Sequence, residues 1–173
     1  MNYARVQCDD IVNGAGLRVS LWVSGCRRHC KGCFNQAAQR FDYGEHFSFD
    51  GGGWKIVSRQ LSEKHVDGLT ILGGEPFEPE NIPMINAICQ VVRRDFPDKN
   101  IWIYTGNTFE ELETMDKENP IVGQILRKID VLVDGAFVEE LRDLECRFRG
   151  SSNQRIVDVK KTLREGEVVL WNS

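Results

Sequence analysis

The chain has 173 residues, of which 41% are hydrophobic and 28% charged, and its formal net charge is −4. This length and apolar content suffice for one compact domain with a buried core. The acidic balance and the scattered basic residues argue against a nucleic-acid partner. No stretch approaches the roughly 18 apolar residues of a membrane span, and the first ten residues lack the apolar run of a signal peptide. We therefore expect a single domain over residues 1–173, in the cytoplasm, without nucleic-acid or membrane partners.

Four short apolar runs, rich in β-branched and aromatic residues, predict β-strands at residues 17–23, 69–72, 101–104 and 131–133. Each run ends at a loop that contains glycine. Apolar residues at helical spacing predict helices over about 54–64, 81–95 and 108–128, the last interrupted near residues 119–120. Strands that alternate with helices form a parallel sheet covered by helices, and ligands bind beyond the carboxyl ends of its strands. We therefore expect the four loops to meet at one edge of the sheet.

Three cysteines, Cys26, Cys30 and Cys33, stand in a Cys-x-x-x-Cys-x-x-Cys spacing directly after the first predicted strand. A structural zinc site has four protein ligands, whereas an iron-sulfur cluster held by three cysteines keeps one iron free to bind another molecule. The spacing therefore favours a cluster. A zinc site completed by His29 or the distant Cys8, or no metal at all, remains open as an alternative.

The other cysteines do not form a second ligand loop, because Cys8, Cys89 and Cys146 are widely separated in the sequence. Apolar residues that begin at Ile85 recur at i, i+3, i+4, i+7 and i+11 and include Cys89, which we expect to be buried in the core. Six cysteines in a cytosolic protein favour metal binding or reactive thiols over disulfides.

The remaining strands end at three short motifs: Gly73-Gly74-Glu75-Pro76, Tyr104-Thr105-Gly106 and Asp134-Gly135. A pair of glycines leaves backbone amides and carbonyls open to a ligand. On its own, Gly-Gly-Glu-Pro is more often just a turn. Next to a three-cysteine loop at the same edge of the sheet, it indicates a binding cavity.

These residues resemble the radical S-adenosylmethionine enzymes, in which a Cys-x-x-x-Cys-x-x-Cys loop binds a 4Fe-4S cluster and a Gly-Gly-Glu segment meets the methionyl group of the cofactor. More narrowly, the chain resembles the subfamily that activates the anaerobic ribonucleoside-triphosphate reductase. The resemblance rests on residues 10–18, 23–26, 32–35, 101–106, 131–135 and 149–155.

The resemblance implies an α/β fold of the radical S-adenosylmethionine type, an incomplete (β/α) barrel of parallel strands with outer helices and an open side. It also implies reductive cleavage of S-adenosylmethionine at the cluster. The 5′-deoxyadenosyl radical would then abstract hydrogen from a glycine in the glycyl-radical subunit of the reductase. A small electron donor such as flavodoxin would supply the electron. No general base or nucleophile is needed, so we expect no catalytic side chain.

Site residues are carried over from the resemblance by position. Cys26, Cys30 and Cys33 would hold one 4Fe-4S cluster. The adenine side of S-adenosylmethionine would contact Gly32, Cys33 and Phe34, and the methionyl end would contact Gly73, Gly74 and Glu75. Two further expected cavity residues are Tyr104 and Asp134, for which a strand-end or turn-capping role is about equally plausible.

Three alternatives remain open. The chain could activate another glycyl-radical enzyme, such as pyruvate formate-lyase, by the same chemistry. It could act on a small molecule, as in modified-nucleoside synthesis, or it could be a non-catalytic zinc-binding module. Residues 149–155 either help to form the face that meets the partner or make a turn between two strands.

Overall fold

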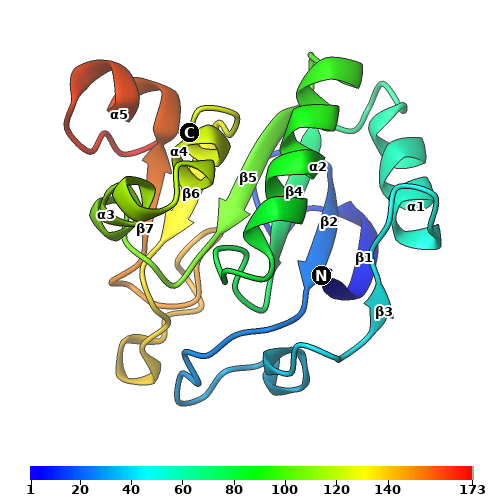
Figure 1. Cartoon of the computed structure of the whole chain (residues 1–173). Helices are drawn as coiled ribbons and strands as arrows, with labels where there is room; N and C mark the ends of the chain where they lie inside the picture. Colours follow the sequence, from blue (N-terminus) through cyan, green and yellow to red (C-terminus); the bar gives the residue numbers. More distant parts are fainter. Residues whose placement is uncertain (173) are drawn as a thin grey trace.

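The computed structural model describes residues 1–172 and contains one seven-stranded sheet with helices beside it (Figure 1). The strands are β1 (Asn2–Asp10), β2 (Arg18–Val23), β3 (Glu45–His46), β4 (Gly68–Gly73), β5 (Asn100–Tyr104), β6 (Val131–Asp134) and β7 (Arg155–Asp158). The helices are α1 (Gly52–Leu61), α2 (Ile82–Asp95), α3 (Phe109–Glu118), α4 (Ile121–Leu126) and α5 (Val159–Glu165). Short 3₁₀ turns, η1 (Gln36–Gln39) and η2 (Glu139–Leu141), lie in two of the loops.

The four predicted strands are confirmed as β2, β4, β5 and β6, which lie side by side and run parallel. The predicted helices are confirmed as α1, α2 and the pair α3 and α4, which is interrupted at residues 119–120 as expected. A capping box starts α3, in which the Thr108 side chain and Glu111 exchange hydrogen bonds with each other's backbone N–H groups. Local sequence signals therefore account for the parallel centre of the sheet.

The edges of the sheet differ from the expectation of a barrel of parallel strands. The sheet order is β3-β1-β2-β4-β5-β6-β7, and β1, β3 and β7 each run antiparallel to their neighbours. Residues 11–17 join β1 to β2, which is too short for the helical crossover that a parallel pair requires. The sheet is therefore mixed rather than all parallel, and the incomplete barrel stays a prediction.

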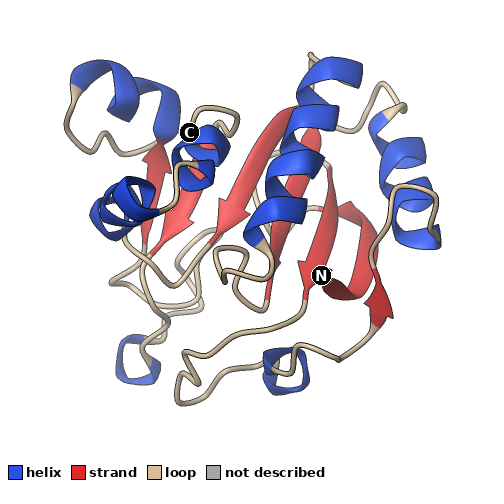
Figure 2. Cartoon of the chain, in the orientation of Figure 1, coloured by secondary structure: helices blue, strands red, loops and turns tan. Residues whose placement is uncertain are grey.

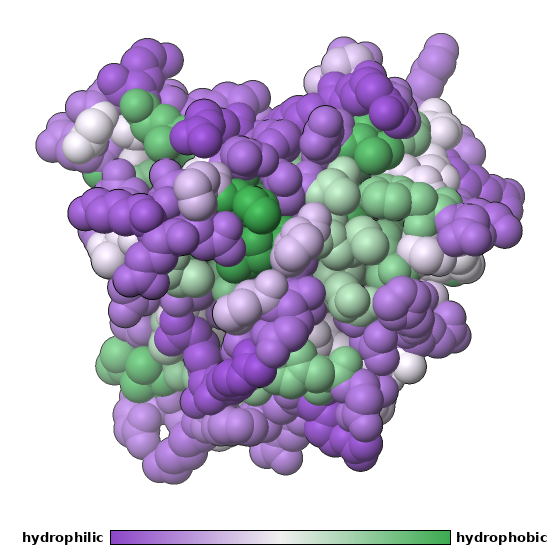
Figure 3. Space-filling model, in the orientation of Figure 1, coloured by the Kyte–Doolittle hydropathy of each residue, from purple (hydrophilic) through white to green (hydrophobic). Residues whose placement is uncertain are grey.

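Helices cover one face of the sheet (Figure 2). Each parallel strand is joined to the next through a helix, and the strand order advances in one direction from β2 to β6. The crossovers therefore place α1, α2 and the α3–α4 pair on the same face. The main core lies between these helices and the sheet, and Cys89 is fully buried in it, as predicted. The surface seen from the same direction is mostly hydrophilic, with smaller groups of apolar residues (Figure 3). Every helix within residues 1–172 is too short or too polar to span a bilayer.

Candidate functional site

A pocket of about 480 Å³ lies at the carboxyl ends of β2, β4 and β5. Its floor includes Trp22, Leu72 and Tyr104, one from each of these strands. Trp22 on β2 lies opposite Leu72 on β4, and neither residue belongs to the core between the sheet and the helices. The pocket is therefore on the face of the sheet that the helices leave uncovered. Its volume lies within the range of small-molecule sites.

Nearly all the site residues predicted from the sequence line this pocket. The lining includes Cys26, Cys30, Gly32, Cys33, Phe34, Gly73, Gly74, Glu75 and Tyr104, and it leaves out Asp134. All three cysteines are half-buried. A fourth cysteine, Cys146, also lines the pocket, although it lies more than a hundred residues further along the chain. Its Sγ contacts Oδ2 of Asp143 at 3.3 Å. No sequence pattern indicated that Cys146 would reach this site.

Backbone hydrogen bonds fix the start of the cysteine loop, residues 26–33, against the end of β4. The Gly74 N–H donates to the Val23 carbonyl at 2.7 Å, and the Glu75 N–H donates to the Gly25 carbonyl at 2.8 Å. On the other side, the Cys26 N–H donates to the Gln39 carbonyl at 3.0 Å. The Gly-Gly-Glu segment therefore continues the pairing of β2 with β4 up to the first cysteine. Burial raises the pKa of the Cys26 thiol.

Glycine is needed at two positions for reasons internal to the chain. A Cβ on Gly74 would lie 2.5 Å from the carbonyl oxygen of Gly25. The space that a Cβ on Gly74 would occupy therefore holds the chain's own backbone, and the contact of Gly74 with the methionyl end stays a prediction. Gly32 has φ of +71°, and a Cβ there would meet the carboxylate of Glu139. Both glycines therefore allow the cysteine loop to pack closely against neighbouring segments.

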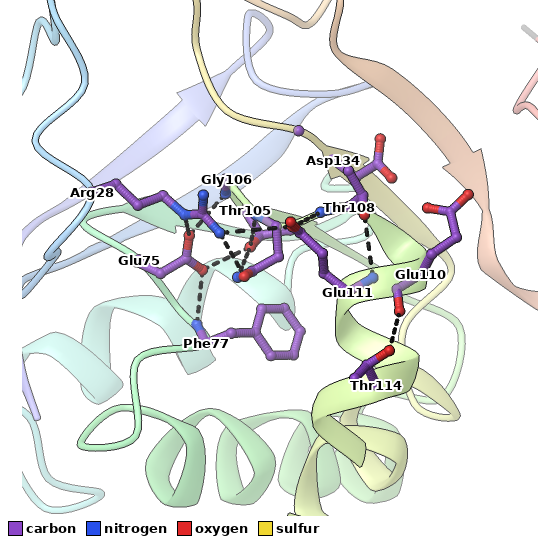
Figure 4. A network of polar contacts seen from close by, with 12 residues as sticks. Arg28, Glu75, Phe77, Thr105, Gly106, Thr108, Glu110, Glu111, Thr114 and Asp134 are labelled. Carbon is purple, nitrogen blue, oxygen red and sulfur yellow. Dashed lines mark hydrogen bonds and ion pairs between the residues drawn. The ribbon is translucent and has the colours of Figure 1, made fainter. Parts of the chain in front are cut away.

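The carboxylate of Glu75 joins three loops at the edge of the sheet (Figure 4). Its Oε1 accepts from the Phe77 N–H at 3.0 Å and the Thr105 hydroxyl at 2.7 Å, and its Oε2 accepts from the Gly106 N–H at 2.8 Å. Nε of Arg28, in the cysteine loop, lies 3.5 Å from Oε2. Burial raises the pKa of Glu75, whereas the surrounding donors and the charge of Arg28 act in the opposite direction. Glu75 thus lines the pocket while its oxygens are engaged by the protein itself.

The side chains of Glu78 and Asn81 also position the cysteine loop, and neither was predicted from the sequence. The Arg27 N–H and guanidinium donate to the buried carboxylate of Glu78, at 2.7 and 2.5 Å. Nδ2 of Asn81 donates to the carbonyls of Ser24 and Glu75, at 3.0 and 2.9 Å. Asn81 directly precedes α2, and its side chain makes no cap hydrogen bond to that helix. Ser24 lies 57 residues earlier in the chain, so no local signal indicated that contact.

Tyr104 and Asp134 have different positions. The Tyr104 hydroxyl donates to the Phe148 carbonyl at 2.7 Å, and burial raises the pKa of this phenol. Asp134 accepts from the Phe109 N–H at 2.8 Å, at the start of α3, and forms an ion pair with Arg155. Asp134 therefore caps a helix at a strand end, outside the pocket, which was the alternative role considered for it. Tyr104 lies in the pocket floor.

Residues 149–155 close the loop that joins β6 to β7. Oε1 of Gln154 accepts from the Gly150 and Ser151 N–H groups, and its Nε2 donates to the Gly135 carbonyl at 3.0 Å. Nδ2 of Asn153 donates to the Ala136 carbonyl at 2.8 Å. These bonds tie the two ends of residues 135–154 together. The middle of that loop then forms one wall of the pocket.

The pocket contains groups suited to a polar ligand. Nε1 of Trp22 and Nε of Arg149 are buried and have no hydrogen-bond partner within residues 1–172, and both residues line the pocket. A buried donor without a partner is destabilising, so an acceptor on a ligand would satisfy it. Three thiols on one wall are the donors that iron-sulfur clusters require. The residues therefore fit a cluster together with a polar ligand.

A zinc site on these three cysteines would need a fourth protein ligand. Neither Cys8 nor His29, the two candidates for a fourth ligand, is part of the pocket lining.

Comparison with known proteins agrees with this donor set. A family model described as "4Fe-4S single cluster domain" matches residues 12–157. The chain is 38% identical to the anaerobic ribonucleoside-triphosphate reductase-activating proteins of Salmonella typhi and Escherichia coli K12, over 89% of this chain and 96% of each relative. It is 35% identical to the protein of the same name from Enterobacteria phage T4, over 90% of this chain and 93% of that relative. The chain therefore belongs to the family of anaerobic ribonucleoside-triphosphate reductase-activating proteins, within the 4Fe-4S single cluster domain family.

Proposed function

We propose that this protein is a radical S-adenosylmethionine enzyme of the cytoplasm that activates the anaerobic ribonucleoside-triphosphate reductase. Cys26, Cys30 and Cys33 would hold a 4Fe-4S cluster, which would pass one electron from a small carrier such as flavodoxin to S-adenosylmethionine for its cleavage to methionine and a 5′-deoxyadenosyl radical. A glycine Cα of the reductase would give up the hydrogen atom, so that 5′-deoxyadenosine and a glycyl radical would be the products. The chain's own residues bind and orient the cofactor, and they exclude water from it.

Each wall of the pocket has a proposed role. Cys26, Cys30 and Cys33 hold the cluster and leave one iron for the cofactor. Gly32 and Phe34 contact the adenine side. Gly73, which is half-buried at the end of β4, would meet the methionyl end.

Two assignments change in the light of the geometry. Glu75 and Gly74 act mainly by fixing the cysteine loop to β4 and β5. The Glu75 carboxylate accepts hydrogen bonds from Thr105 and Gly106, and the backbone of Gly25 fills the space next to Gly74. Tyr104 and Trp22 form the floor, where the free Nε1–H of Trp22 is available to an acceptor on the cofactor.

The observation that carries this proposal is the position of the three cysteines. They line one pocket at the carboxyl edge of a parallel sheet, together with the end of a Gly-Gly-Glu strand. That arrangement supplies thiolate ligands and an adjoining space for a second molecule. A site for a single structural ion would need no such space.

Anaerobic reconstitution followed by iron and sulfide analysis tests the first step. We expect about four irons and four sulfides per chain, and formation of methionine and 5′-deoxyadenosine after reduction with S-adenosylmethionine present. Stoichiometric zinc without sulfide, or a cluster that leaves S-adenosylmethionine intact under reducing conditions, would contradict the proposal.

A further inference from the structure

Among the arginine and lysine side chains of the cysteine loop, only that of Arg28 lines the pocket. The side chains of Arg27 and Lys31 are 56% and 78% exposed, whereas that of Arg28 is 30% exposed. A charge that is partly removed from water acts on its neighbours more strongly than an exposed charge, which salt screens. Of the three cations, Arg28 therefore acts most strongly on a group bound in the pocket.

Arg28 is also tied to the cysteines by the chain itself. It lies two residues after Cys26 and two residues before Cys30. Its Cα is therefore at most about 8 Å from the Cα of either cysteine. Two more arginines, Arg142 and Arg149, line the pocket from the loop between β6 and β7, without such a link to the cysteines. A cluster held by the cysteine loop must have Arg28 as a close neighbour.

Contacts with two other loops hold the guanidinium of Arg28 in place (Figure 4). Its Nε lies 3.5 Å from Oε2 of Glu75, and its Nη2 donates to Oδ1 of Asn107 at 2.5 Å. A Cβ on Gly106 would collide with Cδ of Arg28, so the glycine leaves the room that this side chain fills. The positive charge is thus fixed between the loops that follow β4 and β5.

Carboxylates surround the first cysteine. Glu75 and Glu78 are 4% and 7% exposed, and both add to the effect of burial in raising the pKa of the Cys26 thiol. A cluster gains negative charge when it is reduced, so buried carboxylates oppose its reduction and a nearby cation favours it. Arg27 pairs with Glu78 from the more exposed side. Arg28 is the cation that faces Glu75 within the pocket lining.

We propose that Arg28 tunes the 4Fe-4S cluster electrostatically: its guanidinium, held against Glu75 and Asn107, raises the reduction potential and makes the cluster easier to reduce. This inference rests on the proposed function, because it requires a cluster on the cysteine loop. Net charge and hydrogen bonds near a cluster are among the factors that set its potential. One electron enters the cluster from the carrier, while Arg28 neither gains nor loses a proton.

Glutamine in place of Arg28 tests this role, because it keeps hydrogen-bonding groups and removes the charge. The potential is measured by potentiometry of the reconstituted protein without S-adenosylmethionine, with electron paramagnetic resonance of the reduced cluster as the signal. A unit charge about 10 Å away, at an effective dielectric constant of about 20, changes the ratio of reduced to oxidised cluster roughly tenfold. For Arg28→Gln we therefore expect the midpoint to fall by about 59 mV, which is tenfold for one electron.

Three further variants separate charge from structure. Arg28→Lys retains the charge, so its midpoint should stay close to that of the wild type. Lys31→Gln removes the same charge from an exposed position in the same loop and should leave the midpoint nearly unchanged at about 0.15 M salt. Asn107→Asp leaves Arg28 in place but sets a carboxylate against its guanidinium, so the midpoint should fall. This last variant decides the question if Arg28→Gln does not hold a cluster.

The outcomes distinguish this inference from the proposed function. A wild-type midpoint in Arg28→Gln and Asn107→Asp, each with a full complement of iron and sulfide, would show that Arg28 only holds the loops together and would overturn the inference alone. An equal fall in Lys31→Gln would also overturn it, since the effect would not belong to the pocket. Absence of iron and sulfide from the reconstituted wild-type protein would instead overturn the proposed function.

Discussion

Glutamine in place of Glu75 measures how strongly this carboxylate joins the loops of the site. The amide keeps one oxygen, which can still serve Phe77 and Thr105. Its NH₂ group then faces the Gly106 N–H and Arg28, so a hydrogen bond to a charged acceptor is lost and a buried donor is left unpaired. Such a bond contributes about 1.5–3 kcal/mol, and removal of a buried charge offsets part of its loss. We expect the free energy of unfolding to fall by about 2–3 kcal/mol.

In a protein of this size, that loss corresponds to a decrease in Tm of roughly 5–10 °C. Thermal and urea unfolding of the metal-free protein, followed by circular dichroism under reducing conditions, measures it. Glu80→Gln is the control, because Glu80 lies in the same segment but is about half exposed, and its surface ion pair with Arg27 should contribute little to stability. A Glu75→Gln variant as stable as Glu80→Gln, but with weaker binding of S-adenosylmethionine, would refute this reasoning and make Glu75 a direct ligand contact.

Further substitutions test other parts of the account. Alanine at any cysteine of the cysteine loop should abolish cluster binding in iron and sulfide analysis, whereas Cys89→Ala should keep the cluster and cost about 1 kcal/mol of stability through lost packing. Trp22→Phe keeps an aromatic ring in the pocket floor but removes the free Nε1–H, so calorimetry should show S-adenosylmethionine binding weakened by about 3–10-fold; unchanged affinity would remove that contact. Burial alone would raise the pKa of Asp130, but hydrogen bonds and neighbouring basic side chains lower it. Its contribution to stability is therefore present above about pH 4 and lost as the pH falls through the lower folded pKa, so Asp130→Asn should destabilise the protein at pH 7, and the difference should shrink as the pH falls below about 4 in urea unfolding.

The centre of the fold could be predicted because its signals are local. Runs such as residues 69–72 are continuously apolar, as expected for strands covered on both faces, and the order of strands and helices fixed their parallel arrangement. From that arrangement, the three cysteines and the Gly-Gly-Glu segment could be placed at one edge. The pocket lining confirms this convergence.

The edge strands could not be predicted in the same way. β1 is mostly half-buried or exposed, with polar and charged residues throughout, so its sequence lacks an apolar run. β7 has only four residues. Both strands form because a neighbouring strand supplies hydrogen bonds, which is information from the tertiary structure.

Long-range contacts also decided the roles of several site residues. Glu75 was expected to contact the methionyl end of the cofactor, and its oxygens accept hydrogen bonds from Thr105 and Gly106, about thirty residues later in the chain. Asp134 was expected in the cavity, but Arg155 and the start of α3 hold it outside. In both cases the sequence correctly predicted a carboxylate at the carboxyl end of a strand. The direction and partners of each carboxylate depended on segments that no local pattern connects.

The central claim is that the hydrogen atom comes from a glycine of the reductase, and electron paramagnetic resonance tests it most directly. The reconstituted, reduced protein is mixed anaerobically with S-adenosylmethionine and a reductase that carries glycine labelled with ¹³C at Cα. We predict a doublet glycyl-radical signal with added ¹³C splitting on the reductase, formed together with methionine and 5′-deoxyadenosine. Cleavage of S-adenosylmethionine with no radical on the reductase, or with a radical only on pyruvate formate-lyase when both proteins are offered, would contradict the account.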